Sequence, residues 1–65
     1  MMMTFETALI NSGYYYQPEC GVYWKEDKND NVHTYLELND DEWSYIKYNK
    51  NDDIMHTKVF NLNAK

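Results

Sequence analysis

Residues 32–38, Val-His-Thr-Tyr-Leu-Glu-Leu, show the most regular alternation of side chains in this 65-residue sequence. In an extended chain the even-numbered residues, which begin with Val32 and end with Leu38, point to one side, and His33, Tyr35 and Glu37 point to the other. A period of two predicts a β-strand with different surroundings on its two faces.

Four further segments have strand preference, and short clusters of Asn, Asp, Gly and Pro separate them. The predicted strands are residues 14–17, 22–26, 32–38, 42–48 and 54–62, and the predicted turns are 18–21, 27–31, 39–41 and 49–53. Turns this short can join only antiparallel neighbours. One alternative concerns residues 42–48, because Asp41-Glu42 resembles a helix start, although Tyr45 and Ile46 favour a strand.

The N-terminal part predicts a short helix over residues 4–11. Thr4 is a suitable N-cap, Phe5 and Leu9 fall on one helical face, and Gly13 can end the helix. Together these elements predict an α+β fold: one short N-terminal helix followed by a four- to five-stranded antiparallel β-meander, in a single small domain spanning residues 1–65.

The charge of the chain favours one kind of partner over another. Eleven acidic residues stand against six lysines, there is no arginine, and the formal net charge is −5. Direct nucleic-acid binding needs a basic face, so this chain is a poor candidate for it and a better one for binding a protein with a basic surface. The many Asn, Lys and Tyr residues also suggest an A+T-rich gene, as is common in phages and other mobile elements.

Cys20 is the single cysteine, so an internal disulfide is excluded and a reducing compartment is expected. No signal peptide and no membrane-spanning stretch is recognisable. These features predict a cytoplasmic protein, in the host cell if a phage encodes it, with no membrane partner.

Two patterns that point towards metal binding are incomplete. The segment 27–31 begins like a calcium loop, but Val32 and Leu38 occupy the positions that need Gly and Glu. Cys20, His33 and His56 lie in separate segments without the paired spacing of zinc sites, and no third group orients a Cys–His nucleophile. We therefore expect no metal, no cofactor, no catalytic residue and no enzymatic activity.

A meander distributes the acidic residues between two ends of the sheet. One end collects five carboxylates against Lys25, Lys28 and Lys50, whereas the other collects five carboxylates and no lysine. The predicted partner-binding residues are those of this second end: Glu19, Glu37, Asp40, Asp41 and Glu42, with Trp43 beside them. The alternative is a solvated surface that keeps a small protein in solution.

From these features we expect a non-enzymatic acidic interaction protein, encoded by a phage or mobile element, that binds and inhibits a larger host protein. A nucleic-acid-processing or defence protein is the natural target, and in the strongest form the acidic end imitates DNA phosphates. The alternative is a structural or accessory subunit that forms a homo-oligomer, or packs into a larger assembly, through a Tyr-rich sheet face.

Overall fold

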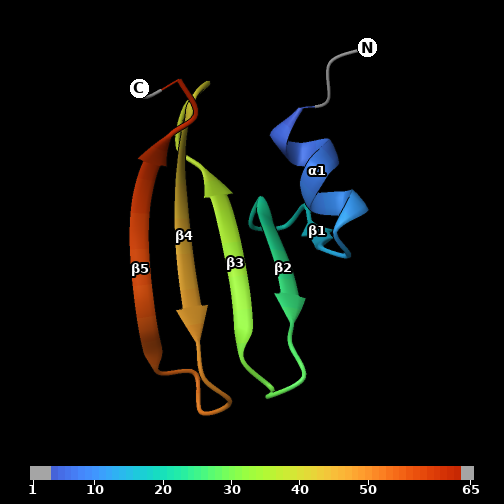
Figure 1. Cartoon of the computed structure of the whole chain (residues 1–65), viewed down its shortest axis with the longest axis vertical. Coiled ribbons are helices and arrows are strands. Elements are labelled where there is room, and N and C mark those ends of the chain that lie inside the picture. The colour runs from blue at the N-terminus through green and yellow to red at the C-terminus, as the bar shows by residue number, and fades with distance from the viewer. Residues whose placement is uncertain (1–3, 64–65) are drawn as a thin grey trace.

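A single antiparallel sheet in meander order forms most of the chain (Figure 1). The computed structural model describes residues 4–63. Its strands follow one another in the sheet as they do in the sequence: β1 (Tyr15–Gln17), β2 (Val22–Glu26), β3 (Val32–Glu37), β4 (Glu42–Tyr48) and β5 (Ile54–Asn61). The predicted α+β meander is confirmed with all five strands, and the segment that could have begun a helix is strand β4.

Helix α1 (Phe5–Asn11) precedes the sheet and is held at both ends. The hydroxyl of Thr4 accepts a hydrogen bond from the Thr7 N–H at 3.1 Å, as its predicted role of N-cap requires. At the other end Lys25 Nζ donates to the carbonyl oxygen of Ser12 at 2.7 Å. The chain then turns at Gly13, whose φ of 94° favours glycine. A helix of this length is unstable alone, so its packing on the sheet must hold it.

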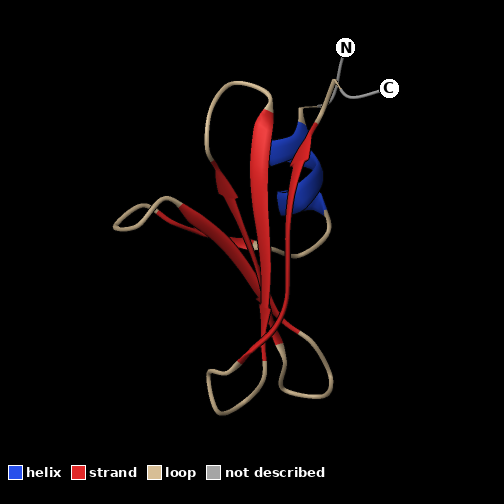
Figure 2. Cartoon of the chain, turned by 90° about the vertical axis from the view of Figure 1, so that its left-hand side faces the viewer, coloured by secondary structure: helices blue, strands red, loops and turns tan. Residues whose placement is uncertain are grey.

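The helix lies on one side of the sheet (Figure 2). A row of tyrosines crosses four strands on that side, because Tyr16 pairs with Tyr23, Tyr23 with Tyr35, and Tyr35 with Tyr45. Phe5 of the helix packs edge-on against Tyr35 with ring centroids 5.4 Å apart. The α1 side is therefore predominantly aromatic.

The core between helix and sheet is small. Among the described residues the fully buried apolar side chains are Leu9 and Trp43, which are 5% and 1% exposed. The ring of Phe5 meets Trp43 at 4.8 Å and Phe60 at 5.8 Å, edge-on in both pairs. These aromatic contacts give a small chain much of the apolar area that it can bury.

The opposite face of the sheet carries no helix and fewer tyrosines than the α1 side. Cross-strand pairing places Tyr15 beside Trp24, Thr34 beside Ile46 and Tyr48 beside Ile54 on this uncovered face. Tyr16, Tyr23, Tyr35 and Tyr45 lie on the α1 side instead. The row of tyrosines thus lies on the α1 side, and the uncovered face mixes aliphatic and polar side chains, with Trp24, Tyr15 and Tyr48 as its aromatic members.

Within residues 4–63, no helix has the length and apolar character needed to cross a membrane.

Candidate functional site

The five carboxylates of the predicted acidic end lie on two turns and the adjoining strand ends, at the same end of the meander. The turn between β1 and β2 carries Glu19, and the turn between β3 and β4 carries Asp40 and Asp41, with Glu37 and Glu42 at the adjoining strand ends. Glu19, Glu37 and Asp40 are exposed, and the other two residues are half-buried. We call these five residues the acidic end.

Hydrogen bonds order the turn of the acidic end between β3 and β4. The Asn39 side-chain oxygen accepts from the backbone N–H groups of Asp41 and Glu42 at 3.4 and 3.2 Å, and its amide donates to Glu42 Oε1 at 3.0 Å. The carbonyl of Asp41 also accepts from the Leu62 N–H at 2.7 Å. This turn therefore presents its carboxylates from a fixed backbone.

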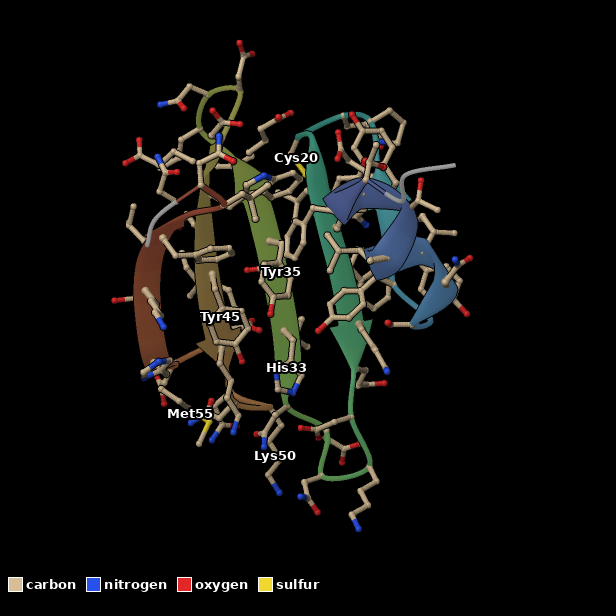
Figure 3. All side chains as sticks on the ribbon, turned by 45° about the horizontal axis from the view of Figure 1, so that its top comes forward. Cys20, His33, Tyr35, Tyr45, Lys50 and Met55 are labelled. Atoms are coloured by element: carbon tan, nitrogen blue, oxygen red, sulfur yellow. The ribbon has the colours of Figure 1, made fainter. Side chains whose placement is uncertain are left out.

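Lysine does not neutralise the acidic end. Within residues 4–63, none of its five carboxylates lies within ion-pair distance of a lysine. Lys25 and Lys47 flank His33 in a cross-strand row towards the opposite end of the sheet. Figure 3 shows Lys50 at that opposite end too. The charge is therefore distributed unevenly along the strands: the acidic end has carboxylates without lysine, and the opposite end has carboxylates and lysines together.

Trp43 does not belong with the acidic end as a partner-binding residue. Its side chain is 1% exposed and packs beneath Phe5. Its indole N–H has no hydrogen-bond partner among the described residues. Including Trp43 among the contact residues is thus corrected: β4 directs this ring into the core, where a partner cannot reach it.

At the other end of the sheet, the loops 27–31 and 49–53 have the same backbone design. Asp27 Oδ1 accepts from the N–H groups two and four residues later, at 2.8 and 3.1 Å, and the Asn49 side-chain oxygen does the same at 2.8 and 3.0 Å. Asp30 and Asp52 occupy equivalent positions with φ values of 65° and 66°. Both carboxylate oxygens of Asp27, the first residue of the segment that resembled a calcium loop, are engaged in hydrogen bonds of the loop and of His33.

One hydrogen-bonded chain of side chains was not predicted from the sequence. His33 Nε2 lies 2.8 Å from Asp27 Oδ2, and His33 Nδ1 lies 2.7 Å from the Tyr45 hydroxyl. A carboxylate only accepts, so Nε2 carries the proton, and in the neutral ring Nδ1 accepts from Tyr45. Both ring nitrogens are engaged, so His33 can bind a metal only by giving up one of these hydrogen bonds.

This chain of side chains has clear electrostatic effects. The hydrogen bond from His33 is the main cause that lowers the pKa of Asp27 from 3.8 to about 2. Burial is the next largest effect and raises this pKa, and the loop N–H groups lower it further. Burial, and then the neighbouring Tyr35 and Asp27, raise the pKa of Tyr45. Burial and the same tyrosine cluster raise the pKa of Tyr14 to about 12. These tyrosines keep their protons at neutral pH.

The three residues considered for metal binding do not come together. Cys20 is exposed and lies at the opposite end of the sheet from His33 (Figure 3). His56 stands two strands away, across Lys47. Among residues 4–63, no three His, Cys, Asp or Glu side chains are placed to hold a metal ion together.

A groove of about 360 Å³ opens on the uncovered face of the sheet. Val22 and Val32 form its apolar part, and Trp24 and Tyr48 give it two aromatic rings. Gln17, Thr34 and Asp52 add polar groups. No local sequence pattern indicates this groove, because Gln17 ends β1 whereas Asp52 lies in the loop between β4 and β5.

Comparison of the chain with protein-family models, with curated proteins and with solved structures found no match.

Proposed function

We propose that this chain is a non-enzymatic interaction protein that binds a basic surface of a larger protein through its acidic end and blocks that surface. The supporting observation is the set of five carboxylates at one end of the sheet, with an ordered turn between β3 and β4 and no lysine paired to them within residues 4–63. Clustered like charges repel one another, and a basic partner relieves that repulsion.

A nucleic-acid-processing or defence protein is the partner class that we propose, because its substrate groove is basic. A small acidic protein in that groove would exclude the nucleic acid and so inhibit the larger protein. In the strongest form of the proposal, the carboxylates occupy the positions of DNA phosphates. The compositional indication of a phage or mobile element favours a bacterial target.

The test compares two triple variants with the same loss of charge. Asp40→Asn, Asp41→Asn and Glu42→Gln alter the acidic end, and Glu26→Gln, Asp30→Asn and Asp53→Asn alter the opposite end. Each variant and the wild type are immobilised for affinity capture from a bacterial lysate, and the captured proteins are identified by mass spectrometry.

We expect wild type and the opposite-end variant to capture the same basic protein, and the acidic-end variant to lose it. Duplex DNA added to the lysate should release that protein if the site imitates DNA. Equal capture by both triple variants would show that the acidic end is only a solvated surface.

A second candidate function is an accessory subunit that assembles through the uncovered sheet face. The observation that favours it is the exposure of large apolar side chains there, such as Leu36 and Val59, which are 37% and 59% exposed. Salt separates the two candidates: a complex led by charge weakens as salt rises, whereas an apolar interface changes little.

A further inference from the structure

We propose that the groove on the uncovered face binds the cationic side chain of a lysine or arginine residue from a partner protein. The groove is distinct from the acidic end, so this inference stands or falls independently of the proposed function. Its support is the combination of aromatic rings, an apolar floor and one carboxylate in the same hollow.

The size of the groove suits a small group. Sites for small ligands generally span about 300–1,000 Å³, and this groove of about 360 Å³ is near the lower limit. It is open to solvent along the sheet, so an extended segment could lie across the face and insert one side chain. The apolar surfaces of Val22 and Val32 match the methylene stem of a long basic side chain.

The two rings favour a cation over a neutral group. Trp24 has the aromatic ring type that attracts cations most strongly, and Tyr48 is the second ring of the same hollow. Trp24 lies against Tyr15 with ring centroids 5.5 Å apart, which limits the movement of the indole. Because the indole is already restrained, binding a cation on its face should cost little further side-chain entropy.

The charged group of the groove has the sign that a cation needs. Asp52 is the single ionisable acid among its lining residues, and none of these residues is a lysine or histidine. No described residue forms an ion pair with the Asp52 carboxylate. The Thr34 hydroxyl donates to the Ile46 carbonyl at 2.9 Å and is left to accept from a ligand. The carboxylate of Asp52 would repel an anionic ligand, and a neutral apolar ligand would gain nothing from its charge.

The chain contains matched reporters and a matched control. Trp24 lines the groove, whereas Trp43 is buried on the other side of the sheet, so their indole N–H signals in an ¹H–¹⁵N spectrum separate local binding from a general effect. Asp30 has the same loop position and the same positive φ as Asp52 but does not line the groove. Asn tolerates this φ nearly as well as Asp, so Asp52→Asn and Asp30→Asn should both fold.

The experiment titrates the full chain with N-acetyl-arginine amide and, in parallel, with N-acetyl-citrulline amide, its neutral isostere. We expect the arginine probe to shift the Trp24 signal saturably at millimolar concentration and to leave Trp43 unchanged. Asp52→Asn should weaken binding about two- to fivefold, as loss of an exposed charge pair does, and Asp30→Asn should not change it.

Trp24→Leu lacks the Trp24 signal, so its affinity is measured from the backbone amide signals of Val32 and Thr34, which also line the groove. This variant should bind the arginine probe more weakly by a similar factor, because it loses the better of the two rings, and unchanged affinity would overturn the proposal. Equal binding of the arginine and citrulline probes would overturn the proposal and define a groove for neutral groups. Unchanged affinity in Asp52→Asn, or no saturable shift of the Trp24 signal, would also overturn it.

Discussion

Asp27 and His33 join the loop of the β2–β3 hairpin to the sheet through a hydrogen bond of 2.8 Å between Oδ2 and Nε2. The other oxygen of Asp27 accepts from two N–H groups of its own loop. The other nitrogen of His33 reaches Tyr45 on the next strand. One carboxylate thus sets the shape of a loop and orients a side chain two residues into β3.

This contact predicts a specific pH dependence of stability. The pKa of Asp27 is about 2 in the folded chain, below its usual 3.8, so the folded state favours the ionised carboxylate. The resulting stability is present above about pH 4 and is lost as the pH falls towards about 2. In Asp27→Asn the decline in stability over this window should be smaller than in wild type, as measured by urea unfolding at several pH values.

Asp30→Asn is the matched control for this measurement, because it removes a carboxylate from the same loop without touching His33. It should keep the steep wild-type decline between about pH 4 and about pH 2. If Asp27→Asn showed the same decline as wild type, the hydrogen bond to His33 would not be formed in solution.

Folding of the chain should depend on the buried side chain of Trp43. A domain of this size has about 3–5 kcal/mol of stability, and replacing a buried tryptophan by alanine costs about 3–5 kcal/mol. We therefore expect Trp43→Ala to lack a cooperative thermal transition by circular dichroism.

Trp43→Phe should fold and lose less stability than the alanine variant. It keeps a ring against Phe5 and removes an N–H group that has no partner among the described residues. A cooperative melt of Trp43→Ala near the wild-type temperature would mean that the core lies elsewhere.

The N-cap of α1 can be tested by a pair of substitutions. Thr4→Ala removes the acceptor for the Thr7 N–H and should lower the free energy of unfolding by about 1 kcal/mol. Thr4→Ser keeps the acceptor and should change it by only a few tenths of a kcal/mol. Urea unfolding measures both, and equal losses in the two variants would show that the methyl group, not the hydrogen bond, matters.

The sequence predicted the elements well because local chemistry determines them. The alternation of residues 32–38 assigns the side chains of β3 to two faces, and the turn clusters on either side set the ends of this strand. Thr4 caps the helix through a hydrogen bond to a residue three positions later. The structure confirms both, with β3 ending one residue earlier than predicted.

What the sequence did not reveal depends on contacts between distant segments. The link from His33 to Tyr45 requires the β3–β4 pairing, and the burial of Trp43 depends on which face the helix covers. Alternation places residues on two faces but does not say which face is covered. The groove additionally requires residues from β1, β2, β3, β4 and the loop after β4 to come together, which no local pattern encodes.

The carboxylates of the acidic end should also affect the stability of the free protein, and this effect bears on the binding experiment. If the carboxylates of the acidic end repel one another, Asp40→Asn, Asp41→Asn and Glu42→Gln together should leave stability unchanged or raise it by less than about 0.5 kcal/mol at low salt. The difference from wild type should disappear in about 1 M salt, where charges are screened within about 3 Å. Thermal melts at both salt concentrations measure this effect.

The hydrogen bonds of Asn39 should survive in this variant, because Gln at position 42 still offers a side-chain oxygen and both N–H groups belong to the backbone. A stable triple variant that no longer binds its partner would then have lost contact with that partner rather than its fold. A loss of more than about 1 kcal/mol that persists at high salt would instead mean that these carboxylates hold the turn, since screening removes repulsion but not a structural hydrogen bond. In that case the reduced binding of the triple variant would not identify the acidic end as the docking surface.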